Sequence, residues 1–233
     1  MRECQITRSI SGNGAEQTLI RELLPADFAV ASGPVRENAF VHHEEAEAIK
    51  TAIDARKHDY SSGRAYARAA LASLGLSGCI IPSRPDRSPA WPESIVGAIT
   101  HSHGLAAAVV GWRRDYAGVG LDVESLTRSL ASGIDRLIRT PAERAQMSEL
   151  ALPEAIDAVR LVFSAKESIH KCVAPQSGVT LGFHDVELDL DPEGQSFRAR
   201  LLRADARLPD FTRIEGRFAF TPRFVMTAVW MAS

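Results

Sequence analysis

The sequence contains no long hydrophobic run and few cysteines. No stretch approaches the roughly 20 apolar residues that span a bilayer, and the most apolar run, residues 104–112, has only the length of a strand. The chain starts with Met-Arg-Glu-Cys-Gln, which does not resemble a secretory signal. Cys4, Cys79 and Cys172 are odd in number and far apart, which excludes a disulfide framework or a zinc ribbon. We therefore expect a cytoplasmic protein that does not contact membranes.

The chain also lacks a strong excess of either charge. Its formal net charge is −2, whereas a nucleic-acid-binding domain normally carries a strong basic bias. We expect no nucleic-acid partner. Hydrophobic residues make up 45% of the 233 residues, which is ordinary for a soluble globular protein with a real core. This length fits one large domain or two small ones.

The first half of the sequence predicts helices followed by a small sheet. The pattern from His43 to Leu74 is helical, and Ser61-Ser62-Gly63 is expected to divide it into two helices. Residues 77–94 are rich in Pro, Gly, Ser, Arg and Asp and predict a long loop, a kind that is often functional. We expect a further helix over residues 15–24 and strands over 27–31, 95–101, 104–112 and 117–124.

The second half repeats this arrangement. Thr140-Pro141-Ala142-Glu143 has the form of a capping box with proline at the first helical position. A helix is expected over 154–174, followed by strands over 184–190, 196–203, 214–220 and 223–231. The prediction is an α+β protein with two similar lobes, residues 1–116 and 117–233, each a small antiparallel sheet packed with helices.

Two carboxylates lie on one face of the expected strand 117–124. Alternate side chains of a strand share a face, so Asp122 and Glu124 point the same way as Gly120, which leaves room for a group to approach the backbone. Neighbouring carboxylates repel each other and need a cation or another partner. The alternative is a solvated pair of side chains without function.

A third carboxylate lies on the expected helix 154–174. Glu167 and Lys171 are four residues apart and share a helix face, whereas Lys166 points elsewhere. The alternative is a modest surface ion pair. Three carboxylates that converge from a strand and a helix would suit Mg²⁺, which prefers oxygen ligands and is usually completed by substrate phosphates.

Both segments resemble the signature motifs of the 4′-phosphopantetheinyl transferase superfamily. Residues 118–124 read GVGLDVE, similar to the family's Gly-(Ile/Val)-Asp-x-Glu strand, and residues 163–171 read FSAKESIHK, similar to its Lys-Glu helix. Thr100-His101 resembles the family's Ser-His strand end. Residues 85–92 resemble its Asp-Lys-Gly-x-Pro-x-Trp-Pro loop, with Arg87 in place of lysine and Ser88 in place of glycine. Arg56 and Arg64 lie in a segment similar to that of the long, monomeric enterobactin-type members.

The resemblance implies a magnesium-dependent enzyme. It would transfer the 4′-phosphopantetheine group of coenzyme A to a serine of an apo acyl or peptidyl carrier protein, releasing 3′,5′-ADP, as holo-[acyl-carrier-protein] synthases do. Asp122, Glu124 and Glu167 would hold Mg²⁺, with Mn²⁺ as an alternative. Asp122, Glu167 and Lys171 would be catalytic, with Glu167 as ligand, general base or both.

The resemblance further implies contacts to coenzyme A and a monomeric state. The residues expected to bind the phosphates of coenzyme A are Arg56, Arg64, Arg87, Thr100, His101, Lys166 and Lys171. For Lys166, the alternative is that it only helps to anchor the helix. Two rival hypotheses remain: another Mg²⁺-dependent phosphoryl transferase or hydrolase, and a coenzyme A-binding protein without catalysis. Polyketide, fatty-acid and nonribosomal-peptide synthesis are the pathways in which such carriers act.

Overall fold

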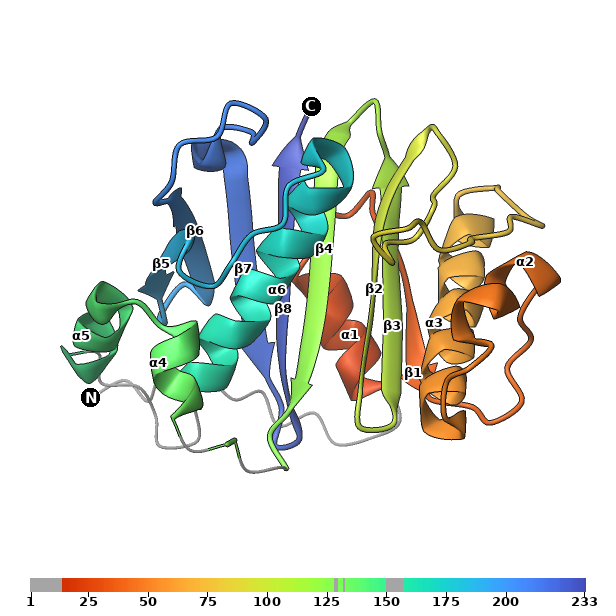
Figure 1. Ribbon diagram of the computed structural model, residues 1–233, viewed down its shortest axis with the longest axis horizontal. Coiled ribbons are helices and arrows are strands. Elements are labelled where there is room, and N and C mark those ends of the chain that lie inside the picture. The colour runs from red at the N-terminus through yellow and green to blue at the C-terminus, as the bar shows by residue number, and fades with distance from the viewer. Residues whose placement is uncertain (1–13, 128–129, 132, 150–156) are drawn as a thin grey trace.

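The computed structural model describes residues 14–127, 130–131, 133–149 and 157–233. Two antiparallel sheets lie beside each other with helices packed on them, which confirms the predicted α+β class (Figure 1). None of the described helices is both long and apolar enough to cross a bilayer.

The first sheet has three strands in the order β1-β3-β2, and helix α3 packs against it. The strands pair in antiparallel register, for example Val30 with Val109 and Thr100 with Ala107. The elements up to this point are α1 Ala15–Glu22, β1 Ala29–Pro34, α2 His43–Ala46, the short 3-10 helix η1 Glu47–Ile49, α3 Asp54–Ser73, β2 Ile95–Ser102 and β3 Leu105–Trp112.

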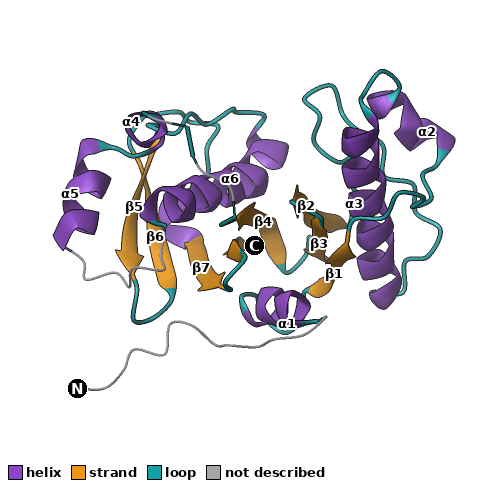
Figure 2. Cartoon of the chain, turned by 90° about the horizontal axis from the view of Figure 1, so that it is seen from below, coloured by secondary structure: helices purple, strands orange, loops and turns teal. Residues whose placement is uncertain are grey.

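The second sheet has five strands in the order β4-β8-β7-β6-β5. Helices α6 and α1 cover its opposite faces (Figure 2). The elements are β4 Tyr116–Ser125, α4 Ile134–Ile138, α5 Pro141–Glu149, α6 Ala158–Ser177, β5 Val186–Asp191, β6 Ser196–Leu201, the 3-10 helix η2 Phe211–Arg213, β7 Ile214–Phe220 and β8 Phe224–Ala232.

One predicted helix break is wrong. Helix α3 runs without interruption through Ser61, Ser62 and Gly63, and the break lies before it, between η1 and Asp54. The Ser61 hydroxyl donates to the His58 carbonyl, and Gly63 lies where a Cβ would come within 2.7 Å of the Ile99 side chain. Close packing of α3 on the first sheet therefore overrides the weak helix propensity of this triplet. The expected helix 154–174 begins at Ala158, and its residues 154–156 lie outside the described residues.

The two sheets share one hydrophobic cluster. Val119, Leu121 and Val123 of β4 are buried, as the alternation predicts, and pack in the same cluster as Val96 and Val109 of the first sheet. Helix α1 contributes Leu19, Ile20 and Leu23 to this cluster. The division into lobes 1–116 and 117–233 stays a prediction, and this shared core connects the two halves.

Side-chain hydroxyls join the sheets where β2 faces β4. The Val123 amide donates to the Thr100 hydroxyl at 3.2 Å, and the Ser125 amide donates to the Ser102 hydroxyl at 3.2 Å. The C-terminal ends of β2 and β4 are therefore held in fixed register, next to the carboxylates of β4.

Gly120 allows helix α6 to lie directly on β4. A Cβ at this position would overlap the Ser168 carbonyl oxygen, next to Glu167. The close approach expected from the sequence is therefore made by the helix, not by a ligand. The apolar stripe of α6, formed by Val162, Ala165, Ile169, Cys172 and Val173, is buried in the second core, as predicted.

Replacing Gly120 by alanine is therefore expected to destabilise the protein by about 1–3 kcal/mol, the usual cost of overpacking. The same change should lower activity, because it displaces α6, which carries Glu167 and Lys171. Urea unfolding and initial rates of the soluble variant would measure the two effects. Gly182→Ala is the matched control, because the nearest atom to its Cβ would be at an ordinary 3.5 Å. Equal stability of the two variants would contradict this prediction.

Candidate active site

A cleft of about 1050 Å³ lies between the two halves of the chain. Its walls come from α3, the loop 83–89, the end of β2, β4 and α6. Residues predicted from separate segments meet there: the cleft is lined by Arg56, Arg64, Arg87, Thr100, His101, Asp122, Glu124 and Lys171. Glu167 and Lys166 are not among the residues that line it.

Asp122 is buried on β4 at the floor of the cleft. Its Oδ1 accepts hydrogen bonds from Lys171 Nζ at 2.7 Å and from the Thr100 hydroxyl at 3.2 Å. Its Oδ2 is buried without a hydrogen-bond partner among the described residues. A buried carboxylate oxygen without a partner is costly, so this atom is suited to receive a cation or a donor from a ligand.

Glu124 and Glu167 are half-buried near Asp122. Burial, together with the charges of Asp122 and Glu167, raises the pKa of Glu124 to about 7, although Lys171 and Arg160 act in the opposite direction. Burial also raises the pKa of Glu167, as does the charge of Asp122, while Lys171 lowers it. The three carboxyl groups therefore sense one another's charge, and each additional negative charge in this region is unfavourable without a cation.

The three carboxylates are not yet arranged around a common point. Within the described part of the chain, no group of three or more His, Cys, Asp or Glu side chains stands ready to hold a metal ion. Lys171 is the positive charge nearest to Asp122, and its ammonium group also donates to the Leu121 carbonyl at 3.2 Å. A cation bound here would require side-chain rotation and would compete with the Lys171–Asp122 ion pair.

Thr100 lines the cleft and is hydrogen-bonded to β4. Its buried hydroxyl donates to Asp122 and accepts from the Val123 amide. Both contacts fix the carboxylate of Asp122 relative to β2. The predicted contact of Thr100 to a phosphate stays a prediction, and the contacts seen here favour a positioning role.

His101 lies at the end of β2 beside helix α3. Its Nε2 is 2.7 Å from Arg56 Nη1, and its Nδ1 is 3.4 Å from Asp59 Oδ2. Burial lowers the pKa of His101, and the charges of Arg56 and Lys171 lower it further, whereas Asp59 and Asp122 raise it. His101 and Arg56 thus stand together at the cleft, as predicted, and Asp59 is an addition that the sequence prediction missed.

Arg64 holds the loop instead of projecting freely into the cleft. Its Nε donates to the Ile81 carbonyl at 2.7 Å, its Nη2 donates to the Ser83 hydroxyl at 3.1 Å, and its guanidinium lies over the Tyr60 ring. Burial lowers the pKa of Arg64. Its predicted direct contact with a phosphate stays a prediction, and the contacts seen here support the loop that carries Arg87.

The loop 83–89 is held at both ends over the cleft. Buried Glu45 accepts from the Ile81 amide at 2.9 Å and from Arg68, a carboxylate contact that the sequence prediction also missed. Arg87 lies at the tip of the loop with a φ of 70°. It stands where the loop motif that this segment resembles has a lysine. Trp91 is buried against Gly97 and therefore fixes the loop.

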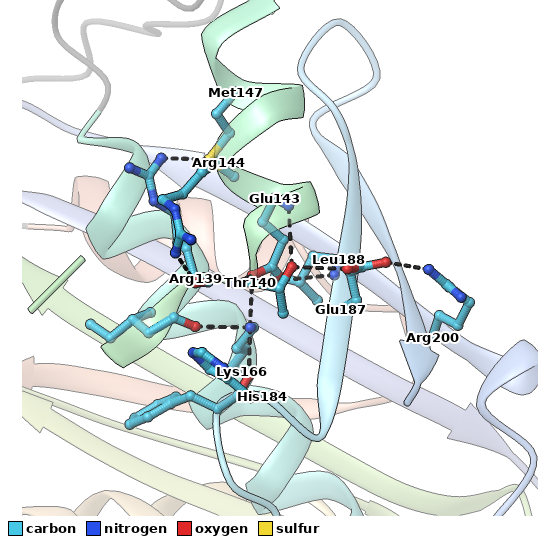
Figure 3. A network of polar contacts seen from close by, with 12 residues as sticks. Arg139, Thr140, Glu143, Arg144, Met147, Lys166, His184, Glu187, Leu188 and Arg200 are labelled. Carbon is cyan, nitrogen blue, oxygen red and sulfur yellow. Dashed lines mark hydrogen bonds and ion pairs between the residues drawn. The ribbon is translucent and has the colours of Figure 1, made fainter. Parts of the chain in front are cut away.

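Lys166 points away from the cleft. Its Nζ donates to Glu143 at 2.8 Å, to the Ile138 carbonyl at 2.9 Å and to the Phe183 carbonyl at 2.6 Å (Figure 3). Glu143 also accepts from the Thr140 amide, which confirms the predicted capping box. These contacts favour the alternative that Lys166 anchors its helix, here to the α4–α5 segment, and its contact with coenzyme A stays a prediction.

Two family models match most of the chain. The family model of the 4′-phosphopantetheinyl transferase N-terminal domain matches residues 44–111, and that of the 4′-phosphopantetheinyl transferase superfamily matches residues 118–225. The two matched ranges meet between β3 and β4, and the first includes His101 while the second includes all three carboxylates.

Individual relatives match over most of their length. The chain is 35% identical to the 4′-phosphopantetheinyl transferase Svp of Streptomyces mobaraensis, over 92% of this chain and 90% of the relative. It is 33% identical to the 4′-phosphopantetheinyl transferase PptT of Mycobacterium tuberculosis, over 80% and 84%. It is 32% identical to enterobactin synthase component D of Salmonella typhi, over 63% and 59%.

Proposed function

We propose a site for the reaction of this chain, which belongs to the 4′-phosphopantetheinyl transferase superfamily and transfers the phosphopantetheine group of coenzyme A to carrier proteins. The reaction takes place in the cleft between β2 and β4, and Asp122, Glu124 and Glu167 hold Mg²⁺ there. The observation that carries the metal proposal is the buried Oδ2 of Asp122, which has no hydrogen-bond partner among the described residues. The charge of Asp122 contributes to raising the pKa of both Glu124 and Glu167, and carboxylates are the hard oxygen donors that Mg²⁺ prefers.

Bound Mg²⁺ would supply charge neutralisation at the pyrophosphate of coenzyme A while the carrier serine attacks the β-phosphorus and 3′,5′-ADP leaves. The remaining work falls to positioning and electrostatics, as in phosphoryl transfer generally. Lys171 would turn from Asp122 toward a phosphate oxygen, since an ammonium group binds such an oxygen as a point charge.

Glu167 is the group that we propose to accept the proton of the attacking serine. Its pKa is raised by burial, so it binds a proton more readily than an exposed carboxylate. A carboxylate that also holds the cation is a weaker base. The balance between these two roles sets how the activity of a Glu167 variant depends on the Mg²⁺ concentration.

Arg56, Arg87 and His101 would bind the phosphates of coenzyme A at the other side of the cleft. Arginine binds phosphate in a bidentate manner, and these three residues line the cleft on the α3 and loop side. Three further residues would support the site without contacting the phosphates. Thr100 would fix Asp122, Arg64 would fix the loop 83–89, and Lys166 would fix α6.

We further propose that the enzyme is of the holo-[acyl-carrier-protein] synthase type (EC 2.7.8.7). It would act as a monomer in which residues 1–116 carry the coenzyme A-binding cations and residues 117–233 carry the metal ligands. Its partners would be apo acyl or peptidyl carrier domains of polyketide, fatty-acid or nonribosomal-peptide synthesis. The relatives named 4′-phosphopantetheinyl transferase and the one named enterobactin synthase component D support this range.

Intact-protein mass spectrometry of an apo carrier mixed with the enzyme, coenzyme A and Mg²⁺ tests the reaction and the metal together. We expect one phosphopantetheine group on the carrier serine, loss of transfer with a chelator, and recovery when Mg²⁺ is added back in excess. Mn²⁺ is expected to substitute, because it takes the same oxygen ligands.

A carrier whose serine is replaced by alanine is the control for the site of attachment. Transfer that continues at full rate in the chelator would contradict the metal proposal. Failure to modify acyl and peptidyl carriers alike would contradict the proposed carrier range.

A further inference from the structure

The imidazole ring of His101 is held between two charged residues of helix α3. Arg56 and Asp59 are three residues apart and therefore share a helix face. Arg56 Nη1 lies 2.7 Å from Nε2 of the ring, and Asp59 Oδ2 lies 3.4 Å from Nδ1. The side chains of His101 and Asp59 are each about one-third exposed, so a ligand in the cleft can reach this group.

These contacts determine where the proton of the ring lies. A guanidinium group has only donors, so Nε2 must accept from Arg56. The single proton of a neutral ring is then on Nδ1, which faces the carboxylate of Asp59. Without ligand, Nε2 of the ring is therefore an acceptor bound to Arg56, whereas a phosphate would need a donor.

A phosphate group in the cleft reverses this requirement. It attracts Arg56, which leaves Nε2 free to take up a proton and to donate to a phosphate oxygen. The resulting imidazolium has two N–H groups, and Asp59 stands opposite the second one. A carboxylate behind an imidazole is a known way to fix the ring and favour its charged form.

We propose that Asp59 is a positioning residue for coenzyme A: it fixes the ring of His101 and stabilises the imidazolium that forms when the 3′-phosphate binds, so that binding takes up a proton. This inference rests on the proposed contact between His101 and coenzyme A. It gives a function to Asp59, an acidic residue that lines the cleft beside Arg56 and His101.

The surroundings of His101 give the expected direction of the pH dependence. The charged groups that face it are Asp59 and Arg56 from α3, Lys171 from α6 and Asp122 from β4; burial lowers the pKa of His101 first, and the two cations lower it further. The incoming phosphate raises this pKa. Since protonation favours the complex, the affinity for coenzyme A should fall as the pH rises between the free and the bound pKa.

Isothermal titration calorimetry of the full chain with coenzyme A, in buffers of different ionisation enthalpy near pH 7, measures proton uptake directly. Dephospho-coenzyme A, which lacks the 3′-phosphate, is the comparison ligand. We expect the wild-type protein to take up a fraction of a proton with coenzyme A and none with dephospho-coenzyme A.

Asp59→Asn should abolish this uptake and weaken coenzyme A binding about tenfold, a typical effect for one hydrogen bond to a charged group, with dephospho-coenzyme A unaffected. Asp59→Glu should restore part of both effects. Asp54→Asn is the matched control on the same helix, because Asp54 is exposed and pairs only with Lys57 among the described residues. It should behave as wild type.

The outcomes separate this inference from the function on which it rests. If His101→Gln binds coenzyme A as tightly as wild type, the proposed His101 contact fails and the inference fails with it. If His101→Gln binds weakly while Asp59→Asn keeps both affinity and proton uptake, only the role of Asp59 is overturned. Equal weakening of both ligands by Asp59→Asn, with unchanged uptake, would mean a purely structural role and would also overturn the inference.

Discussion

Replacing Glu167 by glutamine or Asp122 by asparagine is expected to lower kcat for carrier modification by at least about a thousandfold, the scale for loss of a preorganised charged group at a reaction centre. An amide keeps the shape of the side chain but neither binds Mg²⁺ well nor accepts a proton. Both residues lie at or beside the cleft, and Glu167 is only half-buried. The melting temperature of Glu167→Gln should therefore stay close to that of the wild type.

The Mg²⁺ dependence of the residual activity separates the two proposed roles of Glu167. If Glu167 acts mainly as a ligand, excess Mg²⁺ should restore part of the rate of Glu167→Gln. If it acts mainly as the base, excess Mg²⁺ should have little effect. Glu193→Gln, in the exposed turn between β5 and β6, is the control for loss of a carboxylate. A folded Glu167→Gln variant with near-normal kcat would refute the proposed chemistry.

Replacing Lys166 by methionine is expected to lower the free energy of unfolding by about 3–5 kcal/mol, because it leaves Glu143 as an uncompensated buried charge. The exposed fractions of the Lys166 and Glu143 side chains are 3% and 0%. For a chain of this size, such a loss corresponds to roughly 10 °C in melting temperature. In the folded protein, KM for coenzyme A should change little, since Lys166 does not line the cleft.

The double variant Lys166→Met/Glu143→Met tests the reason for this loss. Removing both charges should be less destabilising than the sum of the single changes, because neither partner is then left unpaired. Lys50→Met breaks an exposed ion pair with Glu47 and should cost no more than about 1 kcal/mol. Urea unfolding of the wild type, the two single variants, the double variant and Lys50→Met provides the comparison. A stable Lys166→Met variant with a strongly raised KM would restore the original prediction that Lys166 binds coenzyme A.

The sequence alone was sufficient for the parts of the site that depend on local periodicity. Alternation along residues 117–124 places Val119, Leu121 and Val123 in the core and Asp122 on the other face, and the structure agrees. The helical stripe of α6 is likewise buried as predicted. These inferences succeed because the side-chain directions of a strand or a helix follow from backbone geometry.

Local periodicity did not identify the partners of each polar side chain. Lys166 and Lys171 are five residues apart on one helix and thus point about 140° apart; one ends in the buried contact with Glu143, the other beside Asp122. The helix geometry alone does not determine which of these two lysines faces the cleft. The structure assigns these directions: Lys166 contacts Ile138 of α4, Glu143 of α5 and the Phe183 carbonyl, whereas Lys171 lines the cleft.

Residue types, their order and the family resemblance were thus enough to predict an α+β phosphopantetheinyl transferase with Asp122, Glu124 and Glu167 as its key carboxylates. Only the tertiary structure decided that Thr100 is bonded to Asp122, that Arg64 is bonded to the loop, and that Asp59 lies beside His101. The physical reason is that hydrogen-bond partners far apart in the chain meet only after packing. The packing of α3 and α6 around β2 and β4 determines which donors remain free to meet a phosphate.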